Sequence, residues 1–268
     1  MTRWVLGVEY DGTCFSGFQR QASPRLPTVQ GDLEAALSRI ANHPVRLVCA
    51  GRTDAGVHAT GQVVHFDSFA LRAAKDWVRG GNTLTHPGIC IHWAIARDEA
   101  FHARFSALWR RYLYLMTDQR PRQSLLRDRV AEVTGPLDAD SMGQAALALL
   151  GEHDFSSFRA AGCQARHARR TVQRIDVRRA GSLVAVEIQA NAFLQHMVRN
   201  IVGSLLEVGR GERPGSWLGE VLSERDRTRA GVAAPPEGLY LVEVGYPGES
   251  ALPSWPATTW PASWAGFC

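Results

Sequence analysis

The sequence predicts an α+β fold built from two halves, each with strands and helices in the order β-α-β-β-α-β. Apolar residues recur at every second position in some segments and at helical spacing in others. The order of these segments is the same on both sides of residue 106, and it is typical of ferredoxin-like units. A chain of 268 residues is also long enough for two modest domains.

The first half begins with a strand, because apolar residues alternate with others over residues 4–10. A helix is expected from Val29 to Ile40, since Pro27-Thr28 is a typical entry and Pro44 prevents its continuation. Alternation over residues 45–49 and again at 64–66 indicates two further strands. A short helix near residues 71–80 and an alternating strand over 89–95 complete the unit.

The second half repeats this order. Residues 110–117 read as a strand and residues 139–150 as a helix that Gly151 closes. Residues 172–178 and 184–190 form a hairpin around Ala180-Gly181-Ser182. An amphipathic helix over 194–205 and a strand over 240–246 follow. The predicted domains are therefore 1–105 and 106–246, and 247–268 is predicted to be an irregular tail rich in Pro and Trp.

Composition narrows the class of protein. The net charge of +4 and a pI of about 9.0 favour an anionic partner such as nucleic acid, although a GC-rich genome would produce the same excess of arginine. No apolar run reaches the length of a membrane span and the amino terminus does not read as a signal peptide, so we expect a cytoplasmic protein without a membrane partner. The 5 cysteines are scattered singly, which favours reduced thiols and no structural zinc.

One loop, Gly51-Arg52-Thr53-Asp54-Ala55-Gly56-Val57-His58-Ala59, carries the most specific chemistry. Glycines allow close approach of backbone or ligand, so Asp54 can face a cleft. Arg52 would keep that carboxylate ionised, which nucleophilic catalysis by aspartate requires. The alternative is an incidental Arg–Asp pair on a surface loop, because such pairs are common and weak.

This loop closely resembles the signature of the tRNA pseudouridine synthase A family, and further segments match in the family's order over residues 3–246. They are Tyr10-Asp11-Gly12-Thr13, Phe15, Gly17-Phe18-Gln19, Arg104-Phe105-Ser106-Ala107, Arg111-Tyr112-Leu113-Tyr114, Gly151, His153-Asp154-Phe155, Phe158, Ala192-Phe193-Leu194, His196-Met197-Val198-Arg199-Asn200, Ala234-Pro235 and Gly238-Leu239-Tyr240-Leu241.

The resemblance implies two tandem ferredoxin-like halves with the active site in a central cleft. It implies isomerisation of uridine to pseudouridine at positions 38, 39 and 40 in the anticodon arm of tRNA, by a homodimer that flips the target base. Asp54 would be the nucleophile, attacking either C6 of the uracil or C1′ of the ribose. Arg199, on the predicted helix, would pair with Asp54.

Two further residues would hold the flipped base, by the same resemblance. Tyr112 would stack on it and Leu239 would pack on its other side. Tyr112 and Tyr114 share one strand face, so core packing is the alternative for both, and it is the stronger reading for Tyr114.

No cofactor is expected, because the sequence contains no dinucleotide-binding glycine motif, P-loop or H-E-x-x-H motif. His58, His65 and His196 lack ligand spacing and read as structural residues or RNA contacts. A basic run would either grip phosphates or form a solvated hairpin edge. Its members are Arg166, His167, Arg169, Arg170, Arg174, Arg178 and Arg179, and Arg20, Arg104 and Arg110 are further candidates for RNA contact.

Two other functions compete with an isomerase. A non-catalytic RNA-binding or RNA-chaperone protein on the same scaffold would keep the basic surface but would not need Asp54. A small-molecule enzyme on a tandem ferredoxin-like fold would need a cofactor or metal motif, and the sequence shows none.

Overall fold

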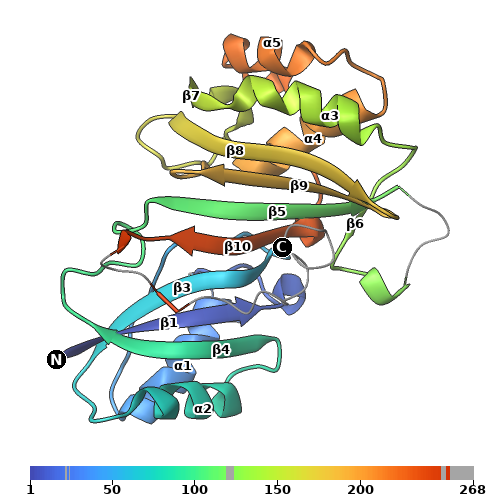
Figure 1. Cartoon of the computed structure of the whole chain (residues 1–268). Coiled ribbons are helices and arrows are strands. Elements are labelled where there is room, and N and C mark those ends of the chain that lie inside the picture. Colours follow the sequence, from blue (N-terminus) through green and yellow to red (C-terminus); the bar gives the residue numbers. More distant parts are fainter. Residues whose placement is uncertain (22, 24, 119–123, 249–251, 254–268) are drawn as a thin grey trace. The chain divides into compact units, whose positions relative to one another are not determined.

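The structure, a computed structural model, describes residues 1–21, 23, 25–118, 124–248 and 252–253 (Figure 1). The α+β class is confirmed, and the chain forms two compact units. Unit 1 comprises Met1–Leu108 and the segment that begins at Tyr240, and the described part of unit 2 is Trp109–Leu239. Among the described residues, no helix is long and apolar enough to cross a membrane.

Unit 1 is built on the antiparallel strands β1 (Thr2–Tyr10), β3 (His58–Ser68) and β4 (Ile89–Arg97), with β1 in the centre. The second edge of β3 is shared. Near its end β3 pairs with the short β2 (Val48–Cys49), and near its start it pairs in parallel with β10 (Leu239–Gly245). The resulting order β4-β1-β3-β2 is that of a ferredoxin-like sheet.

Two helices, α1 (Val29–Ala41) and α2 (Ala74–Leu84), complete unit 1. Helix α1 begins where the Thr28 side chain accepts a hydrogen bond from the backbone N–H of Gly31, and it ends at Asn42 in the left-handed conformation. Trp77 of α2 is fully buried between the rings of Trp4 and Phe66, which pair across β1 and β3. This aromatic cluster fixes α2 on the sheet.

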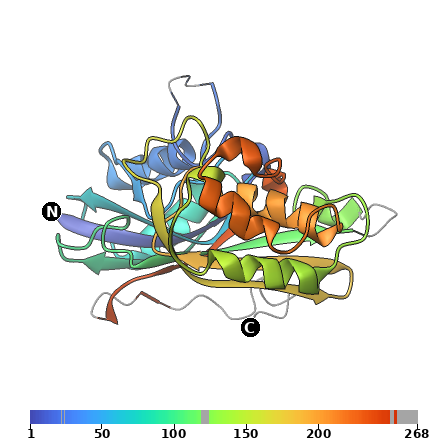
Figure 2. The ribbon, with the colours of Figure 1, turned by 90° about the horizontal axis from the view of Figure 1, so that it is seen from above.

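Unit 2 contains the antiparallel strands β5 (Trp109–Thr117), β9 (Leu183–Ala190), β8 (Arg169–Ala180) and β7 (Gly151–Asp154), in that spatial order. The short β6 (Ala131–Glu132) pairs in parallel with β5. The helices are α3 (Ala139–Ala146), α4 (Met197–Gly209) and α5 (Trp217–Glu224). Helix α3 lies along the β8–β9 hairpin (Figures 1 and 2), where Gly143 approaches Val177.

Short 3-10 turns lie between these elements in both units. They are Gly12–Cys14, Ser124–Leu126, Leu147–Leu149, Ser156–Phe158, Arg227–Arg229 and Pro236–Gly238.

Several element boundaries differ from the sequence-based expectation. The strand expected over 45–49 is reduced to β2, because the N–H groups of Val45 and Leu47 donate to side chains of α1 instead of to a strand. Helix α2 begins later than residue 71, at the point where the Asp76 carboxylate accepts from the N–H of Ala73. The helix expected over 139–150 ends at Ala146 and continues as a 3-10 turn. Strand β7 and helix α5 were not predicted.

The division between the units passes through β10, since Leu239 belongs to unit 2 and Tyr240 to unit 1. The domain limits at 105/106 and 246/247, and the cleft that the family resemblance implies between the halves, stay predictions. Most of the predicted tail at 247–268 lies outside the described residues.

Candidate active site

The Asp54 loop connects β2 to β3 in unit 1 and turns tightly. The N–H of Val57 donates to the carbonyl oxygen of Asp54 at 3.2 Å, and Gly56 adopts a positive φ of 75°. That conformation suits glycine, since a side chain would be strained there. The turn leaves Asp54 half-buried at the surface of the unit.

A buried hydrogen-bond network holds the loop from the side of the sheet. The hydroxyl groups of Tyr10 and Thr53 are 2.8 Å apart. The amide of Gln62, which is 0% exposed, donates to the carbonyl oxygen of Gly51 at 2.6 Å and to the Tyr10 hydroxyl at 3.3 Å. Three side chains from β1, β3 and the loop itself therefore fix the backbone on the amino-terminal side of Asp54.

The segment after β1 holds the loop from its other side. The N–H of Phe18 donates to the carbonyl oxygen of Thr53 at 3.0 Å. A Cβ on Gly17 would lie 3.0 Å from that oxygen and 3.2 Å from the backbone of Asp54, and one on Gly12 would lie 2.1 Å from the carbonyl oxygen of Val57. Only glycine permits these approaches. The backbone around Asp54 is thus clamped from two directions.

Asp11 and His58 form a further contact between the segment after β1 and the start of β3. The His58 ring stacks on Tyr240 with centroids 4.7 Å apart, and its Nδ1 lies 3.3 Å from the Asp11 carboxylate and 3.0 Å from the N–H of Gly12. Both contacts use one ring nitrogen, which either donates a proton to Asp11 or accepts one from the N–H of Gly12, and not both at once. Hydrogen bonds from His58 and then from Thr13 hold the pKa of Asp11 far below its usual range, so this carboxylate is ionised.

Arg52, the predicted partner of Asp54 within the loop, is exposed. The pairing of Arg52 with Asp54 stays a prediction.

In unit 2, Tyr112 lies on β5 and is buried, with its ring edge against Phe193 at a centroid distance of 5.0 Å. Tyr114 is fully buried on the same strand, and its hydroxyl donates to the carbonyl oxygen of Pro235 at 2.9 Å. Burial raises the pKa of Tyr114 far above its usual range, so this phenol stays neutral. These contacts support the core-packing interpretation of Tyr114.

Arg199 lies on α4 and is joined twice to the segment before β10. Its Nε donates to the carbonyl oxygen of Ala234 at 2.7 Å, and the N–H of Ala234 donates to the carbonyl oxygen of Arg199 at 2.9 Å. Leu239 follows as the buried first residue of β10, next to Gly238, where an added Cβ would lie 2.4 Å from the carbonyl oxygen of Leu115. Arg199 is therefore hydrogen-bonded to Ala234, in the segment of unit 2 that leads to Leu239. The pairing of Arg199 with Asp54 stays a prediction.

The basic run on β8 is largely neutralised. Arg169, Arg174 and Arg178 lie beside Glu152, Glu187 and Asp176. Arg179 binds both carboxylate oxygens of Asp118, at 3.1 and 2.6 Å. These pairs favour the solvated hairpin edge over phosphate contact for those four arginines, whereas Arg166 and His167 are exposed.

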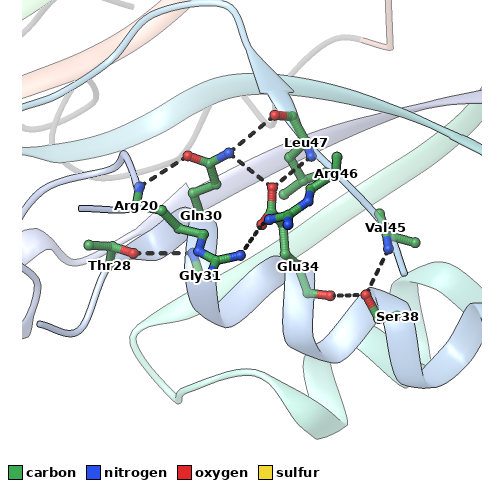
Figure 3. A network of polar contacts seen from close by, with 9 residues as sticks. All are labelled: Arg20, Thr28, Gln30, Gly31, Glu34, Ser38, Val45, Arg46 and Leu47. Atoms are coloured by element: carbon green, nitrogen blue, oxygen red, sulfur yellow. Dashed lines mark hydrogen bonds and ion pairs between the residues drawn. The ribbon is translucent and has the colours of Figure 1, made fainter. Parts of the chain in front are cut away.

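The other proposed RNA contacts differ among themselves. Arg20 and Arg46 both reach the buried carboxylate of Glu34, at 3.3 and 3.2 Å, and this carboxylate also accepts from Gln30 and from the N–H of Leu47 (Figure 3). Arg110 is buried and donates to the carbonyl oxygen of Asn191. Arg104 is exposed, with its guanidinium 5.6 Å from the centre of the Phe105 ring.

Sequence reasoning missed the roles of Tyr10, Gln62 and Gly17. Tyr10 and Gly17 stood in the matched opening motif without an assigned task. Gln62 offered one signal, since it is a single amide side chain in the largely buried β3. A metal site is also not formed within the described residues, where no cluster of three His, Cys, Asp or Glu side chains could hold an ion.

Comparison with known proteins gives matches over most of the chain. A model of the tRNA pseudouridine synthase family matches residues 7–106 and 145–247, which include the Asp54 loop, Arg199 and Leu239. The chain is 52% identical to tRNA pseudouridine synthase A of Xanthomonas euvesicatoria over 94% of its own length and 98% of that protein. It is 53% identical to the protein of the same name from a Shewanella species, over 94% of this chain and 95% of that one.

The solved structure titled "Structure of H/ACA RNP bound to a substrate RNA containing 2'-deoxyuridine" aligns with 76% of this chain and 44% of that one, at 15% identity and a TM-score of 0.37. That likeness is too distant to bear on function. The family match and the two relatives span most of the chain at high identity, and the chain therefore belongs to the tRNA pseudouridine synthase family.

Proposed function

We propose that this chain isomerises uridine to pseudouridine in the anticodon stem-loop of tRNA, at positions 38, 39 and 40. The bond between N1 and C1′ breaks, the uracil turns, a bond forms between C5 and C1′, and the C5 proton is released as N1 is protonated. The atoms balance without a redox partner or cofactor. The clamped Asp54 loop, in a chain of this family, is the observation that carries the proposal.

Asp54 is the proposed nucleophile. Its loop is held by Tyr10, Gln62 and the close approach of Gly17, so the backbone that carries the carboxylate is in place before the substrate arrives. Preorganisation of this kind lowers the barrier because no ordering is needed at the moment of attack. The arrangement serves attack at C6 of the uracil or at C1′ of the ribose equally well, since either atom becomes reachable only after the base leaves its stack.

The residues of unit 2 would hold the base. Tyr112 offers an aromatic ring for the flipped uracil, and its phenol would assist proton transfer at C5. Leu239 would pack on the opposite side of the base, and Arg199 would pair with Asp54. Arg52, which is exposed in the same loop, would keep the Asp54 carboxylate ionised. We further propose that the enzyme is a cytoplasmic homodimer.

The test is Asp54→Asn, which preserves shape and removes the charge. We expect turnover on unmodified tRNA transcript, read as release of tritium from C5, to be lost while tRNA affinity stays within a few-fold of wild type. Asp140→Asn, at an exposed first-turn position of α3, is the matched control and should behave as wild type. Substantial turnover in Asp54→Asn, purified free of host enzyme, would show that Asp54 is structural and would favour a different mechanism.

A further inference from the structure

The segment between β4 and β5 presents an aromatic ring to solvent. Phe105 is 77% exposed, although large apolar side chains are normally buried. Leu108, further along the same segment, is 53% exposed. Neither residue has a task in the proposed reaction so far.

Local hydrogen bonds hold Phe105 in this exposed position. The Nδ1 of His102 accepts from the N–H groups of Arg104 and Phe105, at 3.2 and 3.1 Å, and the Ser106 hydroxyl accepts from the N–H of His102 at 2.9 Å. The His102 ring then lies under the Phe105 ring, with centroids 4.3 Å apart and planes 25° from parallel. The exposed ring is therefore supported from one side by a second ring in a closed turn.

This turn is also anchored to the core of unit 1. His65, which is buried on β3, lies 4.8 Å from the His102 ring, and its Nδ1 accepts from the N–H of Ala103 at 3.1 Å. The Tyr246 hydroxyl donates to the carbonyl oxygen of the same Ala103 at 2.7 Å. Burial, followed by the neighbouring charges, lowers the pKa of both histidines, to about 4 for His65. The supporting rings are thus neutral near pH 7.

We propose that Phe105, supported by His102 and flanked by the Arg104 guanidinium, is a platform on which an unpaired base of the tRNA anticodon loop stacks. Every nucleobase has a π-face that an aromatic ring can bind, and unpaired loop bases are the ones available for it. The guanidinium lies 5.6 Å from the ring centre, where it can meet the phosphate or the π-face of the stacked nucleotide. The proposal rests on the proposed function only for the identity of the RNA.

A nucleobase fits this surface better than a second copy of the chain does. A stable protein interface buries roughly 800 Å² on each partner, whereas the exposed apolar side chains of this segment are Phe105 and Leu108. A single stacked base needs no more than a ring face and a cation beside it. Phe105 also precedes Tyr112, the proposed base-holding residue, in the same stretch of chain.

The first experiment measures binding of unmodified tRNA transcript at one fixed salt concentration. Phe105→Ala should weaken binding about 5- to 150-fold, the equivalent of roughly 1–3 kcal/mol, because one stacked base is lost. Phe105→Trp should bind as wild type, and Phe105→Leu, which keeps apolar area without a π-face, should resemble Phe105→Ala. Phe69→Ala is the matched control, since Phe69 is 74% exposed and also has a histidine ring as its neighbour.

The second experiment places single abasic nucleotides along the anticodon loop. At one position the abasic transcript should bind the wild-type protein as weakly as the intact transcript binds Phe105→Ala, and combining the two changes should cost nothing further. Additive losses at every position, or wild-type binding by Phe105→Ala, would refute the platform. A change in sedimentation mass of Phe105→Ala without RNA would assign the ring to self-association and also refute it.

These results separate the platform from the reaction. Wild-type tRNA binding by Phe105→Ala, when the wild-type protein forms pseudouridine, would count against the platform alone. Phe105-dependent binding by a wild-type protein that forms no pseudouridine would count against the proposed function alone.

Discussion

Removal of the hydroxyl pair between Tyr10 and Thr53 should separate the stability of the Asp54 loop from its catalytic geometry. The two oxygens are 2.8 Å apart and buried, and the Tyr10 hydroxyl also accepts from Gln62. Tyr10→Phe and Thr53→Val each delete one hydroxyl while keeping the shape of the side chain. The double variant deletes both and leaves no hydroxyl of the pair unsatisfied.

The expected energies follow from burial. Each single variant leaves a buried polar group without this partner, which costs about 1–3 kcal/mol. Replacing both partners by apolar groups of similar shape costs little more than replacing one, so the double variant should fall short of the sum by about 1–2 kcal/mol. With a urea m-value of roughly 1–3 kcal/mol/M, a loss of about 1 kcal/mol lowers the urea midpoint by roughly 0.3–1 M.

Catalysis should suffer more than binding does. Thr53 directly precedes Asp54, and displacement of a catalytic group by about 1 Å can slow a reaction about 10²-fold. We expect single-turnover rates of all three variants to fall by about 10- to 100-fold, with tRNA affinity within a few-fold of wild type. Thr85→Val is the matched control, because it deletes a buried hydroxyl bound to Gly81 at 2.9 Å in the same unit and away from the loop.

The assay combines urea unfolding of the four proteins and the control with single-turnover tritium release. Additive unfolding energies together with wild-type rates in all three variants would refute the clamp. A rate loss as large in Thr85→Val would assign the effect to general destabilisation.

Three further predictions concern other parts of the molecule. Tyr112→Phe should bind tRNA normally and turn over about 10²–10⁴-fold more slowly. Tyr112→Ala should also lose roughly 1–3 kcal/mol of binding free energy. Lowered melting temperatures of both variants, with a wild-type rate for Tyr112→Phe, would instead show that the residue is structural. The pKa of His65 is lowered to about 4 in the folded state from about 6.5, so the unfolded chain binds a proton first as pH falls. The free energy of unfolding should therefore drop between pH 6.5 and 4, by about 1–2 kcal/mol after screening by solvent, and His65→Asn should remove this part of the pH dependence in urea titrations. Chelator should leave turnover unchanged when tRNA folding is maintained separately; loss of activity together with one zinc ion per subunit would overturn the expectation of no metal.

Local pattern was sufficient for most of the fold. The alternation over residues 4–10 and the helical face after Thr28 depend on neighbours in sequence, and β1 and α1 formed where these patterns predict them. Strand β7 and helix α5 were not predicted, because elements of 4 and 8 residues contain too few repeats to establish a period. The strand at 45–49 failed for another reason, since side chains of α1 compete for its N–H groups.

The candidate site divides in the same way. The sequence by itself determined that Asp54 lies in a glycine-flanked loop of a recognisable family. It did not show that Tyr10 and Gln62 hold that loop, because Tyr10 is separated from Thr53 by 43 residues and from Gln62 by 52. It showed the charge of Arg179 but not its neutralisation by Asp118, which is 61 residues away. Periodicity and caps are properties of adjacent residues, whereas the partner of a buried polar group depends on how distant segments pack, so only the tertiary structure could decide what holds the Asp54 loop in place.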